Sequence, residues 1–131
     1  MSVMTVTDST FDAEVLQSKL PVLVEFTRQE KKKTGGTDDN ASKKMDDILD
    51  ALVDNYKDKV KFVRVEIKLD GDLKDSLNPV SSTKYYINLG PTLVFIKNGE
   101  RAKDKDGAVI ADVVGHHSKE QVVDWIGQML T

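Results

Sequence analysis

The chain contains no cysteine among its 131 residues. This absence excludes disulfide bonds, thiolate metal ligands, thiol nucleophiles and any cycling between a dithiol and a disulfide. No apolar run is long enough to cross a bilayer, and the first residues lack a basic stretch followed by an apolar one. We therefore expect a cytoplasmic location without membrane association.

The charge is nearly balanced, with 19 lysine and arginine residues against 22 aspartate and glutamate residues and a net charge of −3. Such a balance gives no overall field that would attract nucleic acid or anionic lipid. Hydrophobic residues make up 39% of the chain and charged residues 31%, as in ordinary globular proteins. A chain of this length can bury a core without disulfides, so we expect one domain over residues 1–131. From the balanced charge and the lack of a long apolar run, we expect that it binds neither nucleic acid nor membranes.

The N-terminal part predicts a short strand followed by a helix. Residues 4–7 have strand character. Asp8 and Ser9 offer N-cap chemistry for a helix, and Phe11 and Val15 share one of its faces.

Two apolar strands separated by a helix follow. Residues 22–26 are almost continuously apolar, as in a strand buried on both faces, and residues 60–67 form a second strand candidate. The intervening helix is predicted by apolar residues at spacings of three and four: Met45, Ile48, Leu49, Leu52, Val53 and Tyr56. This order predicts a crossover that joins two parallel strands.

The C-terminal part predicts a hairpin and a final helix. The apolar strand in residues 91–100 ends in Asn98 and Gly99, a strong hairpin signal, and residues 108–114 are the expected antiparallel return strand. Between residues 70 and 90 only short helical turns are expected. A capping box of Ser118 and Gln121 begins the last helix, whose apolar face comprises Val122, Ile126, Met129 and either Trp125 or Leu130. The complete order predicts an α/β fold with a mixed sheet flanked by helices.

Five segments resemble the thioredoxin family in order along nearly the whole chain. They are VTDSTFDAEVL (6–16), PVLVEF (21–26), ILDALVDNY (48–56), KYYINLGPTLVFIKNGE (84–100) and VGHHSKEQVVDWI (114–126). The last two are the most specific, because they combine a glycine-proline-threonine step, the asparagine-glycine turn and a valine-glycine before a capped helix. The resemblance implies a thioredoxin-like three-layer α/β/α sandwich, in which a parallel half of the central sheet is followed by an antiparallel C-terminal hairpin.

The chain departs from the family at the active-site motif. Family members place Trp-Cys-Gly-Pro-Cys between the central strand and its helix, where the helix N-terminus stabilises a thiolate. Alignment from the helix side places Asp39, Asn40, Ala41 and Ser42 on the four-residue motif. A serine hydroxyl cannot perform the thiolate attack of dithiol exchange. The oxidoreductase reaction of the family is therefore excluded for this chain.

The resemblance also implies a peptide-binding groove. Pro91 matches the cis-proline of the family, whose loop offers backbone groups to an extended peptide, and the loop after Gly115 lines the same groove. The groove residues are Leu89, Gly90, Pro91, Thr92, Gly115 and His116. In the alternative interpretation, Pro91 only shapes a tight loop and His116 and His117 are solvated.

Charged residues are predicted at the same end of the molecule. Glu25 matches the buried acidic residue of the family and Arg64 approximately matches the basic residue near it, and without a thiol we interpret them as a buried pair. A basic rim is expected from Arg28, Lys31, Lys32 and Lys33. Such runs are usually solvated loop surface, and the functional alternative is that they dock an acidic partner.

Three functions are open at this point. The leading hypothesis is a redox-inactive protein-binding domain with an adaptor, assembly or chaperone-like role, which uses the proline-loop groove and the basic loop to bind a protein or peptide. The second is a non-thiol enzyme or metal-binding protein that uses the same cleft through Glu25 or His116, although no ligand set or nucleophile-base pair supports it. The third is a degenerate relative with a structural role. We expect no cofactor and no metal site.

Overall fold

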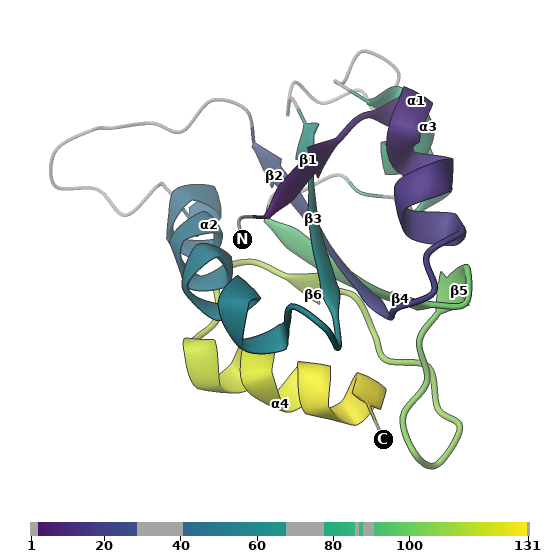
Figure 1. The fold of residues 1–131 in the computed structure, drawn as a ribbon. Coiled ribbons are helices and arrows are strands. Elements are labelled where there is room, and N and C mark those ends of the chain that lie inside the picture. Colours follow the sequence, from purple (N-terminus) through teal and green to yellow (C-terminus); the bar gives the residue numbers. More distant parts are fainter. Residues whose placement is uncertain (1–2, 29–40, 68–77, 86, 88–90, 131) are drawn as a thin grey trace, which may run out of the picture.

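The structure is a computed structural model that describes residues 3–28, 41–67, 78–85, 87 and 91–130. Within these residues, six strands form one sheet with helices on both faces (Figure 1). The strands are β1 (Met4–Val6), β2 (Val22–Arg28), β3 (Lys61–Ile67), β4 (Thr92–Lys97), β5 (Glu100–Arg101) and β6 (Val113–Val114). The helices are α1 (Asp8–Phe11), which continues as the π-helical η1 (Asp12–Leu16), α2 (Ala41–Leu52), which continues as the 3₁₀ turn η2 (Val53–Tyr56), α3 (Pro79–Lys84) and α4 (Lys119–Leu130).

The sheet has the predicted mixed topology. Its strand order is β1-β3-β2-β4-β5, and β6 also pairs with β4. The pairs β1–β3 and β2–β3 are parallel, whereas β4 is antiparallel to β2 and to both β5 and β6. The expected parallel half and antiparallel C-terminal part are therefore confirmed.

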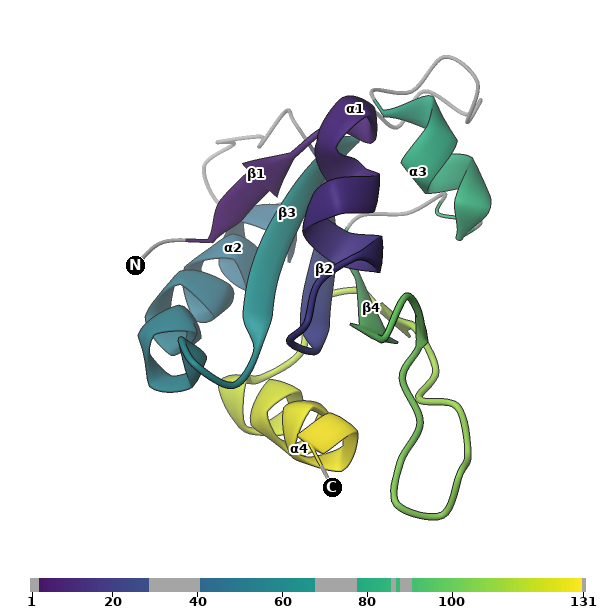
Figure 2. The ribbon, with the colours of Figure 1, turned by 45° about the vertical axis from the view of Figure 1, so that its right-hand side comes forward.

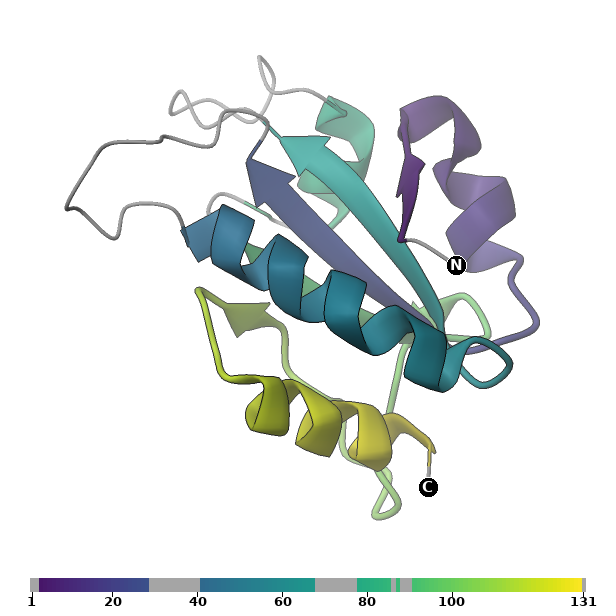
Figure 3. The same ribbon diagram turned by 60° about the vertical axis from the view of Figure 1, so that its left-hand side comes forward.

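Side-chain alternation along β2 separates two apolar cores, one on each face of the sheet. Val22, Val24 and Phe26 pack with Phe11 of α1 on one face. Leu23 packs on the other face with residues of α2 and α4. Figure 2 shows α1 and α3 covering the first face, and Figure 3 shows α2 and α4 across the second. The predicted three-layer sandwich is confirmed, and Glu25 and Thr27 share the α2 face with Leu23 because they follow it at a period of two.

The two long helices bury the predicted apolar faces. On α2, Met45, Leu49 and Leu52 have at most 1% of their surface exposed. On α4 the buried residues are Val122, Ile126 and Met129, and half-buried Trp125 packs on the same core while Leu130 is exposed. The predicted capping box is present, because the Ser118 N–H donates to Gln121 Oε1 at 3.0 Å and the Gln121 N–H donates to Ser118 Oγ at 3.2 Å. No described helix has both the length and the apolar character needed to span a membrane.

The predicted return strand at residues 108–114 is wrong in its extent. Asn98 and Gly99 have φ angles of 55° and 80°, and this two-residue turn pairs Lys97 directly with Glu100 of β5. Only the last two residues of the predicted strand form β6, which pairs with the beginning of β4. Between β5 and β6 the chain turns at Asp104, whose Oδ1 accepts the N–H groups of residues 106 and 108 at 2.8 and 3.0 Å.

The predicted N-cap of the first helix is also wrong. Thr7 occupies the N-cap, and its N–H donates to Thr10 Oγ1 at 3.0 Å. The carboxylate of Asp8 turns instead to α3, where it accepts the N–H groups of Val80 and Ser81 at 2.9 and 2.8 Å and the Ser81 hydroxyl at 2.6 Å. Asp8 therefore caps α3, a helix about 70 residues further along the chain.

Candidate functional site

Two loops meet where β4 begins. Pro91 is buried immediately before β4, and its carbonyl oxygen accepts the Gly115 N–H at 2.8 Å. Thr92 is 3% exposed and is paired within the sheet with both β2 and β6. His116 follows Gly115 and is exposed. The structure thus places four of the six predicted groove residues at one end of the sheet.

The adjacent His117 makes two contacts with its surroundings. Its Nε2 lies 3.0 Å from the carbonyl oxygen of Val114, and because a carbonyl only accepts, the Nε2–H is the donor. The imidazole also meets the ring of Trp125 edge-on at a centroid distance of 5.2 Å. These contacts fasten the loop after β6 to α4.

Several predicted site residues lie outside the described ranges. These are Leu89 and Gly90 of the groove, Asp39 and Asn40 of the motif-equivalent segment, and Lys31, Lys32 and Lys33 of the rim. The predicted cis bond joins Gly90 to Pro91, so it stays a prediction. Ala41 is the half-buried first residue of α2 and Ser42 the second, while Arg28 ends β2; the side chains of Ser42 and Arg28 are not among those described.

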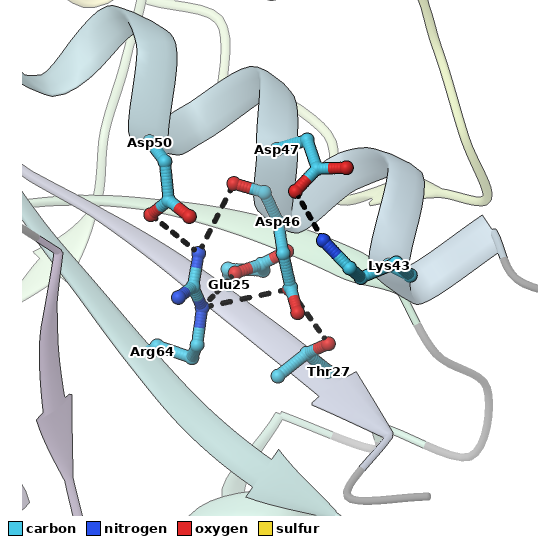
Figure 4. A network of polar contacts seen from close by, with 7 residues as sticks. All are labelled: Glu25, Thr27, Lys43, Asp46, Asp47, Asp50 and Arg64. Carbon is cyan, nitrogen blue, oxygen red and sulfur yellow. Dashed lines mark hydrogen bonds and ion pairs between the residues drawn. The ribbon is translucent and has the colours of Figure 1, made fainter. Parts of the chain in front are cut away.

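A buried polar cluster lies between β2, β3 and α2. Glu25 and Arg64 are direct neighbours in the parallel register, and Arg64 Nε donates to Glu25 Oε1 at 2.6 Å (Figure 4). The Glu25 side chain has 0% of its surface exposed and that of Arg64 has 15%. The structure therefore brings the two predicted partners into a buried ion pair.

Sequence reasoning missed the α2 side of this cluster. Asp46 Oδ1 accepts the Thr27 hydroxyl at 2.9 Å and lies 3.5 Å from Arg64 Nε. Arg64 Nη2 donates to the Asp46 carbonyl oxygen and to Asp50 Oδ1, both at 3.3 Å. The available signal was the spacing: Asp46 and Asp50 are one turn apart beside the apolar face of the helix, and Thr27 is two residues beyond Glu25.

The cluster raises the pKa of Glu25. Burial raises the pKa of Glu25 well above its ordinary value, a hydrogen bond shared with the Asp46 carboxyl raises that pKa further, and the opposing charge of Arg64 does not offset the two. Glu25 Oε2 has no hydrogen-bond partner within the described residues. Across the described ranges, no group of three or more histidine, aspartate or glutamate side chains is placed to hold a metal ion.

The fold and the position of Pro91 define a protein of the thioredoxin class, and comparison with known proteins agrees. Residues 2–128 match the Thioredoxin family. The thioredoxins of Rickettsia prowazekii (strain Madrid E) and Rickettsia felis (strain ATCC VR-1525 / URRWXCal2) are 30% and 31% identical over 125 residues, which is 95% of this chain and 96% of each relative. Thioredoxin 1 of Synechococcus elongatus is 33% identical over 104 residues, or 79% of this chain and 82% of that protein.

The chain belongs to the thioredoxin family, as its sequence resemblance predicted. It contains no cysteine, so it lacks the thiols on which dithiol exchange depends.

Proposed function

We propose that this chain is a redox-inactive, cytoplasmic member of the thioredoxin family that binds other proteins in an adaptor, assembly or chaperone-like role. The observation that carries the proposal is a family scaffold that spans residues 2–128 without a cysteine. Disulfide exchange requires a thiolate, whereas capture of an extended peptide requires only backbone hydrogen bonds and apolar contacts. The chain therefore lacks the group needed for disulfide exchange, whereas peptide binding does not depend on that group.

The geometry at the start of β4 supports a binding role. The hydrogen bond from Gly115 to Pro91 fastens two loops that come from distant parts of the chain. Next to it, β6 pairs only with β4 among the described strands and leaves Val114 51% exposed. An edge of this kind suits a peptide that adds to the sheet in extended form. We propose that the peptide binds beside Pro91 and Gly115, and that the basic rim of Arg28, Lys31, Lys32 and Lys33 attracts its acidic side chains.

An activity measurement tests the redox part of the proposal. The purified chain is added to insulin and dithiothreitol, and precipitation of the reduced insulin chains is followed. We expect the uncatalysed rate, because no residue of the chain can form a mixed disulfide. A Rickettsia thioredoxin serves as the positive control. Any acceleration by the cysteine-free chain would refute redox inactivity.

A recovery experiment tests the binding surface. The chain is used as bait in an extract of its native host, and the captured proteins are quantified for wild type, Pro91→Ala and a variant in which Lys31, Lys32 and Lys33 are alanine. We expect both changes to reduce recovery of the same partner, and we expect salt to weaken the wild-type interaction. Equal recovery by all three proteins would show that neither the groove nor the basic rim binds the partner.

A matched control variant replaces three other lysines with alanine. Lys19, Lys57 and Lys59 are exposed and precede β2 and β3, so they lie at the opposite end of these strands from Pro91. This variant loses the same charge as the rim variant and should recover the partner at the wild-type level. Thermal unfolding followed by circular dichroism establishes that each variant is folded.

A further inference from the structure

A second candidate binding surface lies away from Pro91, on the outer side of α4. A groove of about 560 Å³ separates this helix from the loop that follows β5. Its walls are loop residues 104–106 on one side and Val123, Asp124, Gly127 and Gln128 of α4 on the other. Figures 1 and 2 show this loop standing out from the body of the molecule beside α4.

The loop wall of the groove is held by its own hydrogen bonds. Asp104 Oδ1 accepts two backbone N–H groups, and the Asp104 N–H donates to the Ala108 carbonyl oxygen at 2.8 Å. The Gly107 N–H donates to the Asp104 carbonyl oxygen at 3.1 Å, and Lys103 pairs with Val109 at the base of the loop. A ligand therefore meets a preformed wall, which reduces the entropic cost of binding.

The packing of the described structure does not explain why residue 127 is a glycine. Gly127 lies inside α4, where glycine weakens a helix relative to alanine. A Cβ atom added at this position would meet no atom within 4 Å, so no neighbouring segment of the described structure requires its absence. Val123, one turn earlier, is 37% exposed and lines the same groove. Together they form an apolar floor that a backbone or side chain from another molecule can approach closely.

The charges of the residues that line the groove favour a ligand of positive charge. Among the described residues that line the groove, Asp104, Asp106 and Asp124 are accompanied by one cation, Lys105, so this part of the lining carries two net negative charges. A cationic ligand gains from this field, whereas an anionic ligand is repelled.

We propose that this groove binds a basic segment of a partner protein. An apolar side chain of that segment lies over Val123 and Gly127, and flanking lysine or arginine side chains lie beside Asp106 and Asp124. The surface is separate from the groove at Pro91, and it prefers the opposite charge to the basic rim. The proposal for this groove does not depend on whether the Pro91 surface binds a partner.

Peptide selection tests the inference. A random peptide library is selected on the immobilised full chain, and the Gly127→Gln variant, which fills the groove without changing its charge, is kept for the binding measurements. We expect enrichment of lysine and arginine around a short apolar residue. Isothermal calorimetry with a selected peptide should show about tenfold weaker binding to Gly127→Gln and to Asp124→Lys. Chemical-shift changes on wild type should map to residues 104–107 and to Val123–Gly127.

The matched control is Asp58→Lys, which makes the same charge change at an exposed residue before β3 and should bind like wild type. Gly127→Gln should unfold at a temperature no lower than wild type, because the new side chain enters open space and improves helix propensity. Selected peptides that lack basic residues, or that bind Gly127→Gln as tightly as wild type, would overturn the proposal. Self-association of wild type that Gly127→Gln abolishes would assign the groove to a second copy and would also overturn it.

Discussion

At the scale of single residues, Glu25 occupies an unfavourable position for a negative charge. It lies in the middle of a central strand with no exposed surface, and the Arg64 guanidinium that it contacts also serves Asp46 and Asp50. Desolvation of a carboxylate costs more here than one shared cation returns. The pKa of Glu25 is therefore raised above its ordinary value.

The pKa of Glu25 determines the sign of its contribution to stability. Below the ordinary value of 4.5, Glu25 is protonated in both the folded and the unfolded chain. As the pH rises from there through the raised folded-state pKa, the unfolded chain loses its proton first. The free energy of unfolding contributed by this residue therefore falls across that window.

Glu25→Gln should remove this loss. Glutamine cannot ionise, still accepts from Arg64 and can donate to Asp46, so the variant should exceed wild type by about 1–3 kcal/mol at mildly alkaline pH. Urea unfolding across the pH range measures the difference, which should grow with pH from about 4.5. Glu100→Gln, on exposed β5, is the control and should show no such growth. A variant less stable than wild type at alkaline pH would contradict the raised pKa.

Arg64 should be more costly to remove than Glu25. Arg64→Met leaves the carboxyls of Glu25 and Asp46 beneath α2 without their cation, and loss of one partner of a buried pair typically costs about 3–5 kcal/mol. In the double variant, Glu25→Gln should stabilise the Arg64→Met background by more than it stabilises wild type, as urea unfolding would show. Independent, additive effects of the two changes would mean that the residues are not coupled.

At the scale of secondary-structure elements, Asp8 joins two helices that are distant in the sequence. Its carboxylate accepts three hydrogen bonds from the first turn of α3, and its N–H donates to Asn78 Oδ1 at 2.9 Å. Asp8→Ala should lower the free energy of unfolding by about 1–2 kcal/mol, the usual cost of a lost cap. Hydrogen exchange should accelerate most at the amides of Val80 and Ser81. Asp12→Ala, on the exposed side of the same helical segment, should have little effect at those amides.

The same scale shows where sequence periodicity succeeds and where it fails. The apolar faces of α2 and α4 were predicted because a helix repeats its contacts every three to four residues within one segment. Residues 108–114 contain two buried residues, Ile110 and Val113, but these are three positions apart rather than two, and Val109 is 54% exposed. This burial pattern is not the alternation of a strand, and only Val113 and Val114 of the segment belong to a strand. Burial patterns therefore do not identify the hydrogen-bond partner.

At the scale of the whole molecule, the two cores are coupled through the sheet. Strands β2, β3 and β4 contribute residues to both faces, so one core cannot be lost without exposing the back of the other. We expect a single unfolding transition. The fluorescence of Trp125, the only tryptophan in the chain, reports on the α4 side, and far-UV circular dichroism reports on all helices. Their midpoints should coincide, with or without dithiothreitol; separate midpoints would indicate two independent units.

The sequence by itself determined the family, the order of the strands and helices apart from β5, the buried faces of α2 and α4, and the lack of any thiol for exchange chemistry. These are properties of composition and of local periodicity. Only the tertiary structure decided that Asp46 and Asp50 join the pair of Glu25 and Arg64, and that Asp8 caps α3. It also decided that loop residues 104–106 face Gly127 across a groove. The physical reason is that periodicity indicates which way a side chain points, whereas its partner is set by how distant segments pack.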